Sequence, residues 1–234
     1  MNADDFTDPP VREEFEGGFA YPNLRLESDE DAGTAALTVV GPSNHECFAP
    51  EPGPRRLRSR WWPLAVCREL DDALDVLGNH WRGIHTLELR TEGDPLAVAS
   101  ADVALTSGYD HDPFVREVVL YWTRTLCRLD SAEQAVLAFV EPGSCFVGTL
   151  FELALAAQRT SMAETTDGPV EILLTGMNFG PLPQASGRTR LQSRFAAQDG
   201  HLAALAERIG DPFSAAEAVE LGLVTELRGV VGDQ

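Results

Sequence analysis

The stretch VEPGSCFVGTLFELALAAQR, residues 140–159, organises the interpretation of the whole chain. It predicts the end of a buried strand, a tight turn at Pro142 and Gly143, a loop of small residues, and a helix that begins near Gly148. Glu152 falls at the start of that helix, among leucines and alanines. A carboxylate buried there has a raised pKa and is a candidate for proton transfer. The alternative is that Glu152 faces solvent, where helix N-termini favour acidic side chains.

Composition narrows the classes of function. The 234 residues carry a formal net charge of −19, from 37 acidic and 18 basic side chains. This charge argues against nucleic acid and anionic membranes as partners. Every basic residue is arginine, which excludes a lysine base or a lysine Schiff base. No apolar run is long enough to span a membrane and the acidic N-terminus lacks a secretory pattern, so we expect a cytoplasmic protein.

Cysteine and histidine spacing indicates no metal site. The four cysteines lie in apolar stretches without CxxC pairing, which is typical of reduced thiols inside a cytoplasmic protein. The five histidines form no HxxxH or HExxH array. We therefore expect neither a bound metal nor a disulfide framework.

Apolar spacing predicts strands that alternate with helices. Residues 1–20 are acidic and contain Pro and Gly, which is typical of a loosely ordered arm, and we expect residues 21–234 to form a single domain. The apolar run at 135–140 is typical of a strand buried on both faces. Strands are predicted at 23–28, 35–40, 84–89, 135–140, 171–174 and 223–227, and helices at 62–77, 113–128, 191–195, 200–208 and 214–221. This alternation indicates an α/β fold with repeated ββα units.

An arginine cluster stands out in this acidic chain. Arg55, Arg56, Arg58 and Arg60 fall within the segment PRRLRSR, residues 54–60. Guanidinium groups suit phosphates, so the cluster is a candidate site for a polyanion. The alternative is a solvated loop that pairs with the surplus carboxylates.

Three segments in order resemble the crotonase superfamily, the enoyl-CoA hydratases and isomerases. They are RTEGDPLAVASAD at 90–102, which is similar to a strand and loop of the family, the glycine-bearing loop and helix GSCFVGTLFELALAAQR at 143–159, and GPLPQASGRTRL at 180–191. SAAEAVELGLVTEL at 214–227 is similar to the family's closing motif. The resemblance covers roughly residues 22–228 and implies a crotonase-like spiral of ββα units with C-terminal helices.

Within that superfamily, several segments are similar to the C-terminal half of the benzoyl-CoA-dihydrodiol lyases, among them WWPLAVCRELDDAL, EPGSCFVGTLFELALAAQR, MNFGPLP and GLVTEL. Those enzymes carry a further crotonase module on their N-terminal side. The resemblance therefore implies either a module that acts alone or one part of a split enzyme. Crotonase modules usually trimerise, so we expect a homo-oligomer. A dimer, or a hetero-oligomer with a second crotonase module, is the alternative.

The resemblance also assigns a reaction centre. Crotonases stabilise a thioester enolate with two backbone N–H groups, which act as an oxyanion hole. One donor falls at Ala99, and the other at Thr149 or its neighbour Gly148. Glu152 matches the first of the two family carboxylates that transfer protons. Asp102 matches a family aspartate with a mostly structural role.

The second family carboxylate is missing at its expected place, which is Gly176. Cys145 could compensate as a nucleophile, or it is a packed loop thiol. Asn178 could orient a carbonyl, or it caps a turn. The candidates to compensate are Cys145, Ser144, Asn178 and Glu141.

The sequence thus predicts a crotonase-type lyase or hydratase/isomerase for a cyclic or unsaturated acyl thioester, carried by coenzyme A or by an acyl carrier protein. Arg55, Arg56 and Arg58 would bind the phosphates of coenzyme A, which enters only as part of the substrate. No flavin, nicotinamide or metal cofactor is implied. The alternative is a non-catalytic or half-catalytic subunit of a split crotonase-type complex. A thioester hydrolase or decarboxylase, which needs only one carboxylate, is a third reading.

Overall fold

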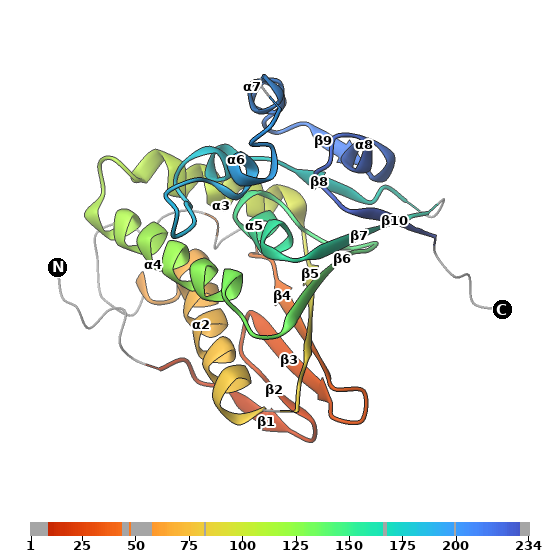
Figure 1. Cartoon of the computed structure of the whole chain (residues 1–234). Helices are drawn as coiled ribbons and strands as arrows, with labels where there is room; N and C mark the ends of the chain where they lie inside the picture. The colour runs from red at the N-terminus through yellow and green to blue at the C-terminus, as the bar shows by residue number, and fades with distance from the viewer. Residues whose placement is uncertain are drawn as a thin grey trace.

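The computed structural model describes residues 9–43, 47, 58–81, 83–165, 168–198 and 200–229. Its main sheet has the spatial order β1-β2-β3-β4-β5-β6-β7-β10 (Figure 1). The strands are β1 Glu13–Phe15, β2 Gly18–Ala20, β3 Leu24–Asp29, β4 Thr34–Val40, β5 Thr86–Glu92, β6 Ala135–Val140, β7 Arg159–Glu164 and β10 Glu226–Gly229. A separate small sheet pairs β8, Glu171–Leu173, with β9, Pro212–Ser214.

The helices connect these strands. The long ones are α2 Trp62–His80, α3 Pro95–Gly108 and α4 Pro113–Asp130, and the buried α5 spans Gly148–Ala156. The short ones are the 3₁₀ helix η2 Gly176–Phe179 and the helices α6 Arg190–Arg194, α7 His201–Ala206 and α8 Ala215–Glu220. Asp94 and Asp112 cap α3 and α4 by accepting hydrogen bonds from the amides of Leu96 and Phe114, and each helix has proline in its first turn.

The sheet changes from antiparallel to parallel along its width. Strands β1 to β4 pair antiparallel, whereas β4, β5, β6, β7 and β10 pair parallel. A parallel pair needs a crossover, and helices provide it: α2 joins β4 to β5, α3 and α4 join β5 to β6, and α5 joins β6 to β7. The predicted α/β class is therefore confirmed.

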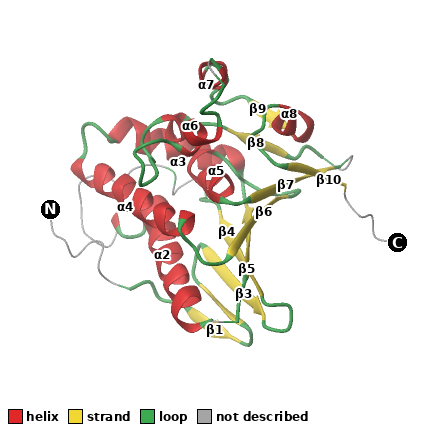
Figure 2. Ribbon diagram, viewed as in Figure 1, coloured by secondary structure: helices red, strands yellow, loops and turns green. Residues whose placement is uncertain are grey.

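The core lies between the sheet and the helices α2, α4 and α5, which Figure 2 shows on the same side of the sheet. Side chains along β4 and β5 alternate between buried and half-buried. The indole N–H of Trp62 donates to the Val40 carbonyl (2.9 Å), and that of Trp122 donates to the Pro63 carbonyl (2.7 Å). Both aromatic rings are therefore buried without leaving an unpaired donor.

The strand at 135–140 is found where it was predicted, but the prediction that both its faces are buried was wrong. Its exposure alternates, because only one face of the sheet packs on the helices. On the other face, Phe139 is half-buried beneath the guanidinium groups of Arg90 and Arg228, whose central carbons lie 4.8 and 5.3 Å from the ring centre. The apolar run reflects cation–π contacts on that face rather than a second helical layer.

The prediction of a loosely ordered arm was wrong for residues 13–20. They form the β1–β2 hairpin, and β2 pairs with β3. Arg12 donates to Asp72 on α2 (3.0 Å), and the Tyr21 hydroxyl donates to the same oxygen (2.5 Å). These contacts hold the hairpin against α2. They could not be predicted from the composition of residues 1–20.

Candidate active site

The helix α5 has no solvent-facing side. Every residue from Gly148 to Leu155 is buried, since α5 packs against α3 and α4 as well as the sheet. A helix surrounded in this way has to bury whatever polar side chain it carries. Glu152 is accordingly 0% exposed. Of the two predicted positions for Glu152, the structure shows the buried one.

Two side chains hold the Glu152 carboxylate. Asn178 donates from Nδ2 to Oε1 (2.7 Å), and Arg190 donates from a terminal nitrogen to Oε2 (2.9 Å). Arg190 is 2% exposed and also donates to both carboxylate oxygens of Asp130, at 3.0 and 2.7 Å. The result is a row of alternating charges, Asp130, Arg190 and Glu152, that joins α4, α5 and α6, with Arg190 and Glu152 buried and Asp130 at the accessible end.

The pKa values of the two buried members, Glu152 and Arg190, are shifted. Burial raises the pKa of Glu152 to about 7, and the Arg190 charge together with the Asn178 hydrogen bond keeps this pKa from rising further. Burial alone would lower the pKa of Arg190, but the charges of Glu152 and Asp130 raise it instead. Glu152 therefore exchanges a proton near neutral pH, as a general acid or base requires.

A second buried carboxylate occupies the predicted oxyanion hole. Asp102 accepts hydrogen bonds from the Thr149 amide (2.9 Å), the Thr149 hydroxyl (2.6 Å) and the Thr175 hydroxyl (2.7 Å). Burial raises the pKa of Asp102 to about 6. The three hydrogen-bond donors act in the opposite direction, because they favour the charged form of the carboxylate. The Thr149 amide thus already binds an internal anion, at the N-terminus of α5 where anions are stabilised.

Gly148 makes this contact sterically feasible. Its φ is +45°, and a Cβ on it would lie well inside contact distance of Asp102 Oδ2 and Thr175 Oγ1. Its carbonyl accepts a hydrogen bond from Asn178 Nδ2 (2.9 Å). Gly148 therefore helps to position the Asp102 and Glu152 carboxylates.

Ala99 lies in the middle of a helix. The segment at 90–102, expected as a strand and loop, instead becomes helical at Pro95, because Asp94 caps a helix that begins with proline. Ala99 is its fifth residue, and a fifth amide already has an acceptor within the helix. Ala99 and Thr149 therefore do not form an oxyanion hole in this conformation.

Asn178 caps a turn, which is one of the two roles that the sequence predicts for this residue. Its Oδ1 accepts from the Thr175 amide (3.0 Å), which closes a capping box at the start of η2. Asn178 thus caps the turn and holds Glu152 at the same time. Gly176 stands beside it, and a Cβ there would lie 3.0 Å from the methyl group of Thr106, so the chain leaves little room for a larger side chain.

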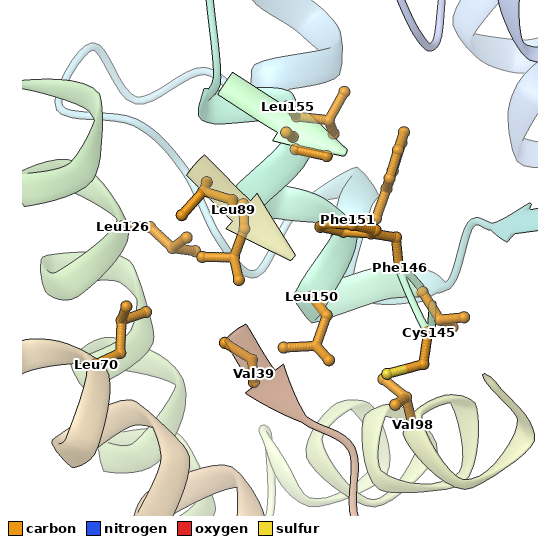
Figure 3. Close-up of a cluster of buried hydrophobic side chains, with 14 of the residues drawn as sticks. Val39, Leu70, Leu89, Val98, Leu126, Cys145, Phe146, Leu150, Phe151 and Leu155 are labelled. Carbon is orange, nitrogen blue, oxygen red and sulfur yellow. The ribbon is translucent and has the colours of Figure 1, made fainter. Parts of the chain in front are cut away.

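Cys145 packs in the core as a loop thiol. It is 0% exposed, and Figure 3 shows its sulfur beside Val98. Burial raises its pKa to about 11, so the thiol stays protonated at neutral pH and is a poor nucleophile. Ser144 accepts from the Glu141 amide (2.9 Å) within the turn, and the Glu141 carboxylate pairs with Arg90.

The arginine cluster is only partly described. Arg55 and Arg56 lie outside the described residues. Arg58 places its guanidinium over the Phe114 ring, 4.9 Å from the ring centre, and its buried Nε has no hydrogen-bond partner among the described residues. Phosphate binding by these three arginines stays a prediction.

Sequence reasoning missed two members of the charged row. Arg190 stands in the quoted motif GRTRL, and a motif arginine in a chain with a buried glutamate was a signal that could have been used. Asp130 ends α4 and had no such signal, because its partner is 60 residues away.

Within the described ranges, no group of His, Cys, Asp or Glu side chains is arranged to hold a metal, and no helix is long and apolar enough to cross a membrane.

The buried carboxylates predict an unusual pH dependence of stability. Burial raises the pKa of Glu69 and Glu152 to about 7 and that of Asp102 to about 6. Each therefore contributes stability that is fully present below its unfolded pKa and is lost as the pH rises through the folded value. We expect the free energy of unfolding to fall by about 2 kcal/mol or more between about pH 5 and pH 7.5. Urea denaturation at several pH values measures it, and a flat or rising profile would contradict this expectation.

The chain is similar in sequence to a known lyase. No protein-family model matches the chain. Benzoyl-CoA-dihydrodiol lyase of Aromatoleum evansii is 38% identical over 213 residues, which are 91% of this chain and 38% of the relative. The chain thus spans well under half the length of that lyase.

Solved structures agree on the fold. An enoyl-CoA hydratase of Geobacillus kaustophilus matches with a TM-score of 0.56 and 17% identity, over 94% of this chain and 70% of that one. An enoyl-CoA hydratase of Bacillus halodurans matches with a TM-score of 0.56 and 15% identity, over 88% and 73%. The chain is therefore a homologue of part of benzoyl-CoA-dihydrodiol lyase, and it has the crotonase fold of the enoyl-CoA hydratases.

Proposed function

We propose that this chain is a crotonase-type lyase or hydratase module that acts on a cyclic or unsaturated acyl-CoA, with Glu152 as the group that transfers the proton. The observation that carries the proposal is a buried carboxylate with a pKa of about 7, held by Asn178 and Arg190 in a homologue of a lyase whose name specifies a CoA thioester. An acyl carrier protein thioester remains the alternative substrate. The cytoplasmic location and the homo-oligomeric state stay predictions.

The chemistry requires two changes from the conformation described. The thioester oxygen would replace Asp102 at the Thr149 amide, so that the amide meets the developing negative charge of an enolate. Glu152 would take or return the proton, while Arg190 and Asn178 hold its carboxylate in place. Opening the contact between α3 and α5 would bring the substrate to both groups, since Asp102 belongs to α3 and Thr149 to α5.

The test replaces Glu152 with glutamine, which keeps the shape of the side chain and removes its proton transfer. We expect turnover of unsaturated and cyclic acyl-CoAs to fall by about 10²- to 10⁴-fold. Calorimetric binding of the same thioesters should stay within a few-fold of the wild type. The exposed Glu133→Gln change removes the same charge and should leave turnover unaltered. Full turnover by a folded Glu152→Gln protein would remove Glu152 from the mechanism.

A second function is favoured by a different observation. The Thr149 amide and both Glu152 oxygens are bound by the chain's own side chains. These facts support a non-catalytic or half-catalytic subunit that works beside a second crotonase module. In that case the chain alone turns over no thioester, and Glu152→Gln leaves the activity of the assembled complex unchanged. Activity of the isolated chain would exclude this second function.

A further inference from the structure

The charged row beside Glu152 contains more negative than positive groups. The single guanidinium of Arg190 lies between two carboxylates, those of Glu152 and Asp130. Arg190 and Glu152 are buried, whereas the Asp130 side chain is 20% exposed. When all three groups are ionised, the row carries a net negative charge, which is costly at a buried position. One bound proton makes the row neutral, and Glu152 is its buried carboxylate.

The two carboxylates do not share the Arg190 guanidinium equally. Its Nε and one terminal nitrogen donate to the two oxygens of Asp130, at 3.0 and 2.7 Å, which is the bidentate geometry of a strong ion pair. The other terminal nitrogen donates to Glu152 (2.9 Å) and also to the Leu182 carbonyl (3.4 Å). Asp130 therefore balances more of the guanidinium charge than Glu152 does.

The place of Asp130 in its helix is unfavourable by itself. Asp130 is the last residue of α4, and the partial negative charge of a helix C-terminus disfavours an acidic side chain there. Arg128, the basic residue in the last turn of α4, forms ion pairs with Asp71 and Asp75 of α2. Helix stability therefore does not explain the carboxylate of Asp130, whereas its contact with Arg190 does.

Few charged groups act on Glu152 from the elements packed around it. Burial raises the pKa of Glu152, the Arg190 charge lowers it, and the Asp130 charge raises it. Asp102 on α3 is bound instead by the threonine hydroxyls and the amide described above. The turn η2 contributes the neutral side chain of Asn178. Among the described residues, Arg190 and Asp130 are thus the charges that control Glu152.

We propose that Asp130 is a positioning residue for Glu152, because it holds Arg190 through two atoms, offsets part of its positive charge and so keeps Glu152 able to bind a proton at neutral pH. This inference rests on the proposed proton transfer by Glu152 and adds the group that controls it. Asp130 does not touch the substrate and acts through Arg190. Since Asp130 is the accessible member of the row, the protonation of a fully buried carboxylate is controlled from the surface.

The experiment follows the carboxylic-acid C=O stretch of Glu152 by infrared difference spectroscopy of the full chain at several pH values, without substrate. The band is assigned by its loss in Glu152→Gln. We expect a midpoint near pH 7 in the wild type. In Asp130→Asn, which keeps the side-chain shape and removes the charge, the midpoint should fall by about one pH unit. Asp130→Ala should lower it as well, so one folded variant of the two suffices, and Asp130→Glu should restore the wild-type midpoint.

The matched control is Glu133→Gln. It removes an exposed carboxylate from the segment just after α4, outside the charged row, and should leave the midpoint unchanged. An unchanged midpoint in Asp130→Asn overturns the proposal, because a residue that only packs Arg190 would affect stability and not the titration. An equal fall in Glu133→Gln also overturns it, since the total charge of the chain would then be the cause.

Turnover separates this inference from the proposed function. In a chain that turns over an acyl-CoA, the pH of half-maximal rate should fall together with the infrared midpoint in Asp130→Asn. A chain without turnover whose infrared midpoint still falls supports the role of Asp130 and contradicts only the catalytic use of Glu152.

Discussion

Replacing Gly148 with alanine should destabilise the protein by about 4 kcal/mol or prevent it from folding, because two costs fall on one buried residue. Its φ of +45° strains any side chain, and the added Cβ would collide with the Asp102 carboxylate and the Thr175 hydroxyl. Neither partner can withdraw, because the hydrogen bonds among Asp102, Thr149 and Thr175 fix them in place. Chemical denaturation measures the change.

A matched control separates strain from collision. Gly143 has a φ of +85° in the turn after β6, and nothing lies within 4 Å of a Cβ built on it. Gly143→Ala should therefore cost only the backbone strain, about 1 to 2 kcal/mol. If Gly148→Ala costs no more than Gly143→Ala, the Asp102 contact does not restrict this position, and the oxyanion site is less tightly closed than the structure shows.

Replacing Arg190 with methionine should cost about 3 to 5 kcal/mol at pH 7.5, because it removes the cation between two carboxylates and leaves Glu152 buried without a counter-charge. The cost should shrink near pH 5, where Glu152, with a pKa of about 7, is already protonated in the folded protein. Glu152→Gln in the same chain should recover part of the loss, and a double-mutant cycle measures that coupling.

The control for Arg190 lies two residues earlier. Arg188 is exposed and forms no ion pair among the described residues, so Arg188→Met should change stability by no more than about 0.5 kcal/mol. A small effect of Arg190→Met, with no dependence on pH, would mean that the charged row contributes little net stability. Glu152 would then be free to leave Arg190 during catalysis.

Much of the fold was predictable because local patterns decide it. The apolar spacing of α2 and α4, the continuous run of β6 and the caps around α8 place these elements close to where the structure has them. The predictions at 90–102 and at 13–20 were wrong for a common reason. Small or polar residues are compatible with several conformations, and the choice among them depends on contacts with α5 in one case and α2 in the other.

The candidate site was likewise predictable from the sequence only in part. The sequence alone determined that Glu152 belongs to an apolar helix that follows a glycine-bearing loop, because neighbouring residues encode that turn; the structure places it in the middle of this helix rather than at its start. Only the tertiary structure decided that Arg190 and Asn178 hold its carboxylate and that Asp102 occupies the Thr149 amide. These partners lie 26 to 47 residues apart in the chain. Burial and charge pairing act through space, so no local pattern of residues records them.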